Sequence, residues 1–188
     1  MPQPQLHLLA GPNGSGKSTY VEHVLLPDTG LPFINADLIA AELWPGRESE
    51  MSYDAAQLAD ERRQSLLNAR KSFIAETVFS HPSKVQLAMQ AIQLGYFVTL
   101  HVMVVPLVLA SQRVEDRVGS GGHSVPADKI TARYERLWPL VVAAAGAVHE
   151  AWFYDNSAAA APYQVLGIAH AGQVSQTGTI PGDCPRFC

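Results

Sequence analysis

The nine residues at positions 11–19, Gly-Pro-Asn-Gly-Ser-Gly-Lys-Ser-Thr, limit the fold of this 188-residue chain more than any other segment. They follow the apolar run 6–10, which predicts a buried strand, and they lead into residues 17–26, which predict a helix. The spacing G-x-x-x-x-G-K-S between a strand and a helix is that of a phosphate-binding P-loop. We therefore expect ATP to bind here, with Lys17 on its β- and γ-phosphates and Ser18 as a ligand of Mg²⁺.

The glycines of this loop permit left-handed backbone and a close approach to phosphate. Successive backbone N–H groups at the start of the helix then form an anion-binding nest. The residues expected to bind the nucleotide in this loop are Gly11, Pro12, Asn13, Gly14, Ser15, Gly16, Lys17, Ser18 and Thr19.

Strand and helix signals alternate along the chain, which predicts an α/β fold: a three-layer P-loop NTPase or kinase architecture with a mainly parallel central sheet. The expected strands are residues 6–10, 31–35, 73–75, 97–105, 151–154 and 163–169. The expected helices are residues 17–26, 38–43, 55–69, 83–94, 107–118 and 126–146, with a turn at 27–30 and Ser83 as an N-cap. We expect residues 1–170 to form the kinase domain and residues 171–188 to form a loose tail or an edge hairpin.

Composition excludes several classes of protein. A hydrophobic content of 47% and a charged content of 16% fit one globular domain rather than a disordered chain. The net charge of −4 argues against broad nucleic-acid binding, which needs a cationic surface. No apolar run approaches the roughly 18 residues of a membrane span, and the first residues lack the basic segment of a secretory signal. We therefore expect a cytoplasmic protein with no membrane partner.

The two cysteines, Cys184 and Cys188, both lie in the last five residues. This placement excludes a disulfide scaffold and provides no set of neighbouring metal ligands. We expect both thiols to be reduced and exposed in a terminal tail.

Polar residues follow several of the expected strands, at the edge where ligands of open α/β sheets bind. Asp37 is suited to accept the proton of an attacking hydroxyl or to hold water around Mg²⁺, although it could instead serve only as a helix N-cap. Glu76 and Thr77 are suited to bind a substrate hydroxyl, the alternative being an exposed strand-end carboxylate without a ligand. Asn156 follows a late strand and is expected at the nucleotide.

Four arginines flank the glycine-rich segment 119–122. Planar guanidinium groups stabilise the charge of a phosphoryl group in transfer, and helices joined by a glycine hinge suit a closing lid. We expect a helical lid at about residues 113–137, with Arg117 and Arg133 catalytic, Arg113 at the nucleotide and Arg136 at the substrate. The alternative is a solvated pair of helices whose arginines bond to neighbouring carboxylates.

His123 lies in the same glycine-rich stretch and could contact phosphate or substrate. A loop histidine beside glycines could equally be only solvated.

Together these residues resemble the zeta-toxin family of P-loop kinases, in particular its short chromosomal members. The likeness covers about residues 5–157. The matching stretches are Ala10–Thr19, Ile34–Ile39, Ala75–Thr77, Arg113–His123, Val125–Arg136 and Tyr154–Ser157.

The resemblance implies an ATP-dependent kinase that phosphorylates a hydroxyl of a small molecule, which in the toxins proper is the sugar of a UDP-N-acetylhexosamine. It implies Asp37 as the base and Lys17 and Ser18 as the phosphate and Mg²⁺ ligands. It further implies Arg117 and Arg133 as phosphate-binding arginines and Glu76 and Thr77 as substrate contacts. A separate antitoxin chain is a candidate partner.

Two other functions stay open. A nucleic-acid end kinase would share the P-loop, but the acidic balance and the lack of a basic and aromatic stripe argue against it. A nucleotide-binding regulator with slow hydrolysis would need no acceptor, so Asp37 and Glu76 would be dispensable in it.

Overall fold

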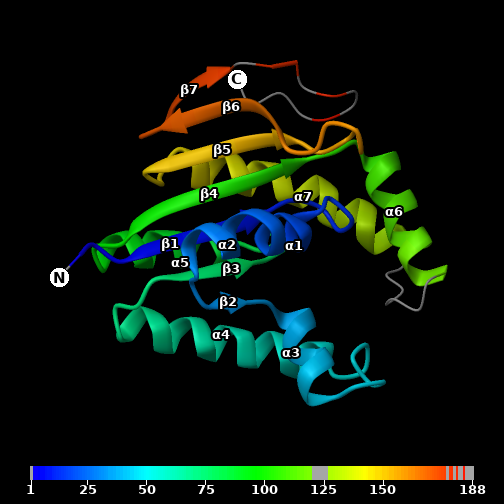
Figure 1. Ribbon diagram of the computed structural model, residues 1–188, viewed down its shortest axis with the longest axis horizontal. Coiled ribbons are helices and arrows are strands. Elements are labelled where there is room, and N and C mark those ends of the chain that lie inside the picture. The colour runs from blue at the N-terminus through cyan, green and yellow to red at the C-terminus, as the bar shows by residue number, and fades with distance from the viewer. Residues whose placement is uncertain (1, 120–126, 177, 180, 182–183, 185–188) are drawn as a thin grey trace.

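The computed structural model describes residues 2–119, 127–176, 178, 179, 181 and 184. Its centre is a seven-stranded sheet in the order β2-β3-β1-β4-β5-β6-β7 (Figure 1). The first five strands are parallel, and β6 and β7 continue the sheet antiparallel at one edge. Their bounds are β1 Gln5–Ala10, β2 Phe33–Ile34, β3 Phe73–Glu76, β4 Phe97–Val104, β5 Glu150–Asp155, β6 Gln164–His170 and β7 Gln173–Gln176. The predicted α/β class with a mainly parallel sheet is confirmed.

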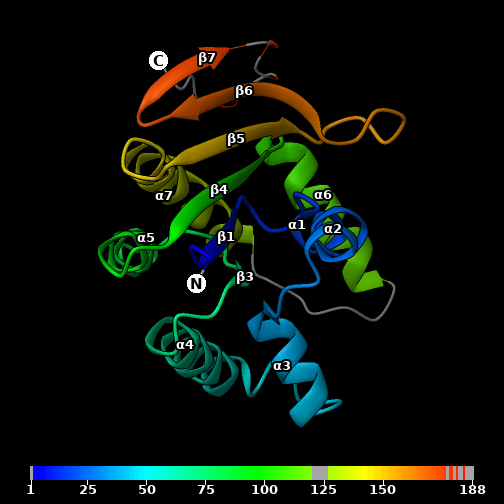
Figure 2. The same cartoon turned by 60° about the vertical axis from the view of Figure 1, so that its left-hand side comes forward.

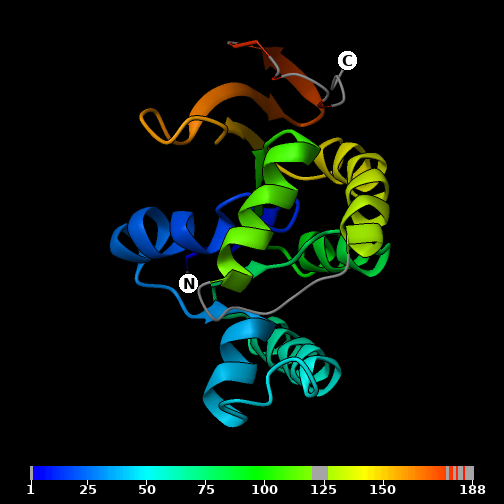
Figure 3. The ribbon, with the colours of Figure 1, turned by 90° about the vertical axis from the view of Figure 1, so that its right-hand side faces the viewer.

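Helices cover both faces of this sheet. On one face lie α1, η1 and α2, and on the other lie α5 and α7 (Figure 2). The pair α3 and α4 lies beside β2, and α6 lies beyond the carboxyl end of β4 (Figure 3). Their bounds are α1 Lys17–Tyr20, η1 Val21–Leu25, α2 Leu26–Thr29, α3 Ala36–Leu43, α4 Ser52–Asn68, α5 Ser83–Gln93, α6 Leu107–Gly119 and α7 Ala127–Ala145.

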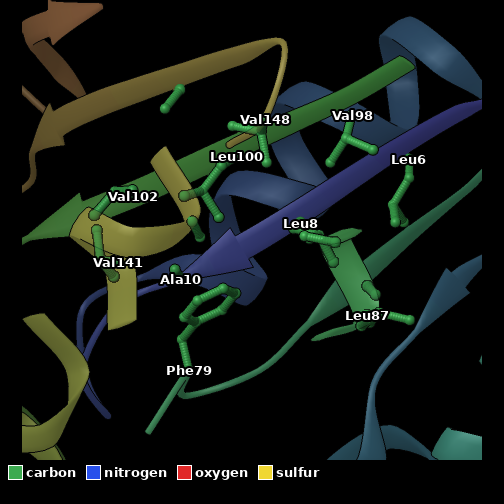
Figure 4. Close-up of a cluster of buried hydrophobic side chains, with 14 of the residues drawn as sticks. Leu6, Leu8, Ala10, Phe79, Leu87, Val98, Leu100, Val102, Val141 and Val148 are labelled. Carbon is green, nitrogen blue, oxygen red and sulfur yellow. The ribbon is translucent and has the colours of Figure 1, made fainter. Parts of the chain in front are cut away.

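The strand residues alternate between two hydrophobic clusters, one on each face of the sheet. On β1, Leu6, Leu8 and Ala10 belong to the larger cluster with α4, α5 and α7, whereas Leu9 belongs to the smaller cluster with α1 and η1. Figure 4 shows part of the larger cluster, where Leu8 and Val141 lie among its labelled side chains. Fully burying one such side chain contributes about 1.5–3 kcal/mol, so these clusters fix the strands whose ends form the site.

The segment after the P-loop differs from the single helix predicted at residues 17–26. Four residues of α-helix give way to five residues of π-helix and then to α2. The predicted turn at 27–30 is wrong, because residues 26–29 form α2, with Pro27 in its first turn. The chain turns only at Gly30, which ends α2 with a φ of 62°.

Three further expectations need correction. Ser83 is not the cap of α5, which begins after Pro82 without a side-chain cap, and the Ser83 hydroxyl instead lies 3.0 Å from Nδ1 of His81. The predicted strand at 31–35 is reduced to the two residues of β2. Cys184 is not exposed but buried in the larger hydrophobic cluster, where its sulfur accepts a hydrogen bond of 3.5 Å from the Tyr134 hydroxyl on α7. Cys188 lies outside the described residues.

Beyond residue 171 the chain returns as β7, which pairs with β6. The division into a kinase domain of residues 1–170 and a tail stays a prediction. In the part of the chain that the structure describes, no helix is long and apolar enough to span a membrane.

Candidate active site

The site lies where β1, β3 and β5 end, between the P-loop and the loops that follow β3 and β5. These strand ends lie on the side of the molecule where α6 stands in Figures 1 and 3. A cleft of about 440 Å³ opens there. It is lined by Asn13, Gly14, Gly16, Lys17, Ser18, Thr19, Asp37, Glu76, Val78, Arg113, Asn156 and Tyr163.

Two glycines let the P-loop fit against its neighbours. Gly14 has a φ of 75°, and a β-carbon there would lie 2.7 Å from the carbonyl oxygen of Ala110 on α6. Gly16 has a φ of 86°, and its β-carbon would overlap the side-chain amide of Asn156 at 2.3 Å. Left-handed backbone and close approach therefore both require glycine at these positions.

The lysine of the motif is buried over its own loop. Its ammonium donates to the carbonyl oxygens of Gly11 at 3.0 Å and Pro12 at 2.9 Å, and it lies 3.8 Å from Oε1 of Glu76. Only 5% of Lys17 is exposed, and the residue lines the cleft. An ammonium held beside an anion nest is suited to neutralise phosphate oxygens.

The loop also contains unsatisfied polar atoms. Within the described part of the chain, Oδ1 of Asn13 and Oγ of Ser15 are buried and have no hydrogen-bond partner. Buried polar atoms without partners cost about 1–3 kcal/mol each. Their position in the loop marks a place where a bound group could supply partners.

Glu76 forms hydrogen bonds both with the P-loop helix and with the segment that leads into α3. Its Oε2 accepts a hydrogen bond of 2.8 Å from the Ser18 hydroxyl and one of 2.7 Å from the Asn35 amide. Glu76 is not the exposed strand-end carboxylate of the alternative interpretation, because it is bonded between the two loops; its binding of a substrate stays a prediction. Its first contacts are with protein groups that flank the expected metal position.

The helix that carries Asp37 is capped by a different residue. Oδ1 of Asn35 accepts from the backbone N–H of Asp37 at 2.7 Å and of Leu38 at 3.2 Å, so Asn35 is the N-cap of α3. The alternative interpretation of Asp37 as only an N-cap is therefore wrong. Its carboxylate lies in the first turn of α3 and lines the cleft that the P-loop also lines.

The outer side of the P-loop is held by the segment after β5. The Asn156 amide donates to the carbonyl oxygen of Ser15 at 2.9 Å, and the Tyr163 hydroxyl donates to that of Gly16 at 3.2 Å. Carbonyls that are bonded on this side leave the N–H groups of the same peptide planes directed into the nest. Both residues therefore help to orient the phosphate-binding backbone.

Arg113 on α6 braces the same segment. Its guanidinium donates to the carbonyl oxygen of Asn156 at 2.9 Å and to that of Ser157 at 3.4 Å. The residue also lines the cleft, so it connects α6 with the wall of the nucleotide site.

A buried series of rings supports the P-loop helix from within the sheet. Tyr163 packs edge-on against Tyr20 with ring centroids 5.0 Å apart, and the Tyr20 hydroxyl donates to that of Tyr154 at 3.0 Å. Tyr154 then lies 3.4 Å from Nδ1 of His101, whose Nε2 lies 3.0 Å from Nδ1 of His7. Burial lowers the pKa of His101 to about 3 and raises the pKa of Tyr154, so both are held neutral.

The structure therefore brings together most of the predicted site residues of the P-loop, with Asp37, Glu76, Arg113 and Asn156. Thr77 is not among the cleft-lining residues, and its hydroxyl instead accepts from the backbone N–H of Phe79 at 3.0 Å. The individual catalytic and binding roles of the predicted site residues stay predictions.

The predicted lid is placed only in part. Arg133 is half-buried and Arg136 is exposed on α7, and neither lines the cleft. Arg117 lies on α6, while His123 falls outside the described residues. Closure of a lid over the cleft stays a prediction.

Of the site residues that the sequence reasoning missed, Asn35 and Tyr163 make the polar contacts with the P-loop side of the cleft. Asn35 carried a usable signal, because an Asn immediately before the first helical residue is a favoured N-cap. Tyr163 carried none, since it reaches the P-loop from 147 positions along the chain and with a left-handed φ of 55°. Positive φ is uncommon for a bulky residue and is tolerated where surrounding contacts fix it.

The oxygen groups at Ser18 fit Mg²⁺. A hydroxyl and a neighbouring carboxylate are hard oxygen donors, and Mg²⁺ is commonly held by one or two protein oxygens together with substrate phosphates and water. Among the described residues, no group of three or more His, Cys, Asp or Glu side chains could hold a metal by itself. This combination suits a cation that enters with a nucleotide.

The sequence matches the family described as AAA domain over residues 6–139, so the chain belongs to that family. No curated protein matches the sequence at a significant level.

Several solved structures share the fold. The AvrRxo1-ORF1:AvrRxo1-ORF2 complex with ATP has a TM-score of 0.73 at 16% identity, with 93% of this chain and 60% of that chain covered. The PezAT chromosomal toxin–antitoxin system of Streptococcus pneumoniae has a TM-score of 0.63 at 16% identity, with coverages of 82% and 68%. The Pnkp1/Rnl/Hen1 RNA repair complex has a TM-score of 0.59 at 19% identity, with coverages of 74% and 46%.

This chain thus spans about 60% of the length of the AvrRxo1 chain that it matches. At these identities the likeness establishes the fold, and it bears out the P-loop kinase architecture and the resemblance to zeta-toxin-like kinases at that level.

Proposed function

We propose that this member of the AAA-domain family transfers the γ-phosphate of ATP to a hydroxyl of a small molecule. The observation that carries the proposal is the position of Asp37. Its carboxylate lines the same cleft as Lys17, Ser18 and Glu76, so a base and a phosphate cradle face one space. A regulator with only slow hydrolysis has no need for a base at that place.

In this mechanism the acceptor oxygen attacks the γ-phosphorus while the bond from that phosphorus to the β,γ-bridging oxygen breaks. ADP leaves with the electron pair of the broken bond, and Asp37 takes the proton of the acceptor hydroxyl. The P-loop N–H groups bind the β-phosphate, and Lys17 neutralises charge on the transferring oxygens. Mg²⁺, when bound with ATP, supplies further charge neutralisation at the phosphates, and Ser18 is the residue that would hold it.

Arg117 and Arg133 are the residues that we assign to clamp the transferring group in a closed state. Arg117 is carried by α6, the helix that also carries the cleft-lining Arg113, and Arg133 is carried by α7. A guanidinium that arrives with closure stabilises transition-state charge without strengthening binding of the ground state.

The acceptor that we propose to test first is a UDP-N-acetylhexosamine, on the strength of the zeta-toxin resemblance. The experiment incubates the protein with ATP, Mg²⁺ and a panel of UDP-sugars and other hydroxyl metabolites, and measures a mass gain of one phosphate. Lys17→Ala serves as the control for nucleotide dependence. Phosphorylation of oligonucleotides with a free 5′-hydroxyl, and of no metabolite, would show that the protein is a nucleic-acid end kinase instead.

A separate antitoxin chain is the protein partner that we propose. The support is that one structural neighbour, PezAT, is a chromosomal toxin–antitoxin system and that another, AvrRxo1-ORF1, was solved together with AvrRxo1-ORF2. Growth arrest on expression of this chain, relieved by Lys17→Ala, would support the toxin assignment, whereas normal growth with full phosphotransfer would contradict it.

A further inference from the structure

Asn35 joins the two sides of the cleft through one side chain. It is 6% exposed and lies between β2 and α3. Its carbonyl oxygen accepts from two backbone N–H groups of α3, while its amide nitrogen donates to Glu76 at 2.7 Å. These partners fix the orientation of the amide, because a backbone N–H can only donate and a carboxylate can only accept.

Glu76 in turn sets the direction of a proton on the P-loop. Its Oε2 accepts from the Ser18 hydroxyl at 2.8 Å. When this hydroxyl donates to Glu76, its hydrogen points away from the cation position and its lone pairs stay available to a cation. A carboxylate that rotates away would leave the hydroxyl free to turn, and cation binding would then have to reorder it.

We propose that Asn35 is a positioning residue for the metal–nucleotide complex, which acts by locking Glu76 in the rotamer that orients the Ser18 hydroxyl. The inference rests on the proposed function, since it assigns a role within the same ATP site. It also gives the helix of Asp37 and the cation position one shared support. A single buried amide thereby fixes the position of Asp37 relative to the P-loop.

Asn35 could otherwise serve only to cap α3, and the two roles can be separated chemically. Serine is an N-cap about as good as asparagine, so Asn35→Ser keeps a cap for α3. Its hydroxyl is too short to replace the amide that reaches Glu76. If Asn35 acts only as a cap, the Asn35→Ser variant should therefore bind the metal–nucleotide complex as the unmutated protein does.

The experiment measures the dissociation constant of the Mg²⁺ complex of a non-hydrolysable ATP analogue by calorimetry, and Mn²⁺ binding by electron paramagnetic resonance, in the full chain. The same analogue with EDTA reports binding without metal. For Asn35→Ser we expect about five- to tenfold weaker binding with metal and less than a twofold change without it. Thermal unfolding controls for the cap, with Asn35→Ala as the variant that loses it.

A double-mutant cycle with Glu76→Gln tests the route through Glu76. If Asn35 acts through that carboxylate, the double variant binds the metal–nucleotide complex no more weakly than Glu76→Gln alone. Fully additive effects, or an unchanged dissociation constant in Asn35→Ser, would overturn the proposal and leave the kinase assignment standing. Failure of the unmutated protein to bind the nucleotide with metal would overturn both.

Discussion

The side-chain amide of Asn156 donates to the carbonyl oxygen of Ser15 over 2.9 Å, and this contact occupies the space that a β-carbon on Gly16 would need. The loop after β5 is thus fitted against the back of the P-loop. This fit explains why the glycine of the motif and an amide 140 positions later belong to one structural unit. The phosphate-binding conformation depends on both.

Gly16→Ala should abolish nucleotide binding. Its β-carbon would lie 2.3 Å from Nδ2 of Asn156, and its φ of 86° adds left-handed strain of about 1–2 kcal/mol. Gly30→Ala is the matched control, because Gly30 also has a positive φ, of 62°, but nothing lies within 4 Å of its added β-carbon. Calorimetric titration with ATP should show binding lost in the first variant and retained in the second. Equal affinities would mean that the Asn156 contact does not shape the loop.

Tyr163→Phe should weaken ATP binding by about two- to tenfold, the worth of one hydrogen bond of about 0.5–1.5 kcal/mol. The variant removes the 3.2 Å bond to the Gly16 carbonyl but keeps the ring that packs on Tyr20. Tyr53→Phe makes the same chemical change on a residue that is 79% exposed, and it should leave the dissociation constant unchanged. A normal affinity in Tyr163→Phe would show that the hydroxyl does not position the loop.

The sequence was sufficient to predict the site residues that lie directly after the ends of strands. The P-loop motif and the carboxylates at Asp37 and Glu76 could be predicted to share one cleft, because parallel strands end at one edge of the sheet. Their partners could not. Glu76 was expected to face substrate, yet it bonds to Ser18 and Asn35 across separations of 58 and 41 residues.

Contacts between segments that are far apart in the sequence could not be predicted, because they depend on how those segments pack in the fold. Tyr163 reaches Gly16 only because β5 lies two strands from β1, and Cys184 is buried only because the chain end returns to Tyr134. The π-helical turn of η1 also has no local pattern, since its period differs from that of an α-helix by a single hydrogen-bond register.

Asp37→Asn should lose phosphoryl transfer by about 10²–10⁴-fold while the variant still folds and binds ATP, because it removes the proton acceptor and not the cap of α3. We expect a stability loss of about 0.3–1 kcal/mol from the missing charge in the first helical turn. Asp54→Asn removes the equivalent first-turn charge of α4, and it should lower stability similarly without affecting activity. Acceptor phosphorylation by mass spectrometry and urea unfolding measure the two effects. Full activity in Asp37→Asn would remove Asp37 from the role of base.

The buried histidine beneath the P-loop helix should make stability fall in acid. Burial lowers the pKa of His101 to about 3 in the folded protein, whereas the ordinary value is 6.5. The unfolded chain therefore binds up to one more proton at His101 between these values, so His101 lowers the free energy of unfolding by up to about 1.4 kcal/mol per pH unit as the pH falls below 6.5. His101→Gln should make this slope shallower in urea unfolding between pH 7 and pH 5, while His23→Gln, at an exposed site, should not. An unchanged slope in His101→Gln would mean that His101 takes up its proton in the folded state.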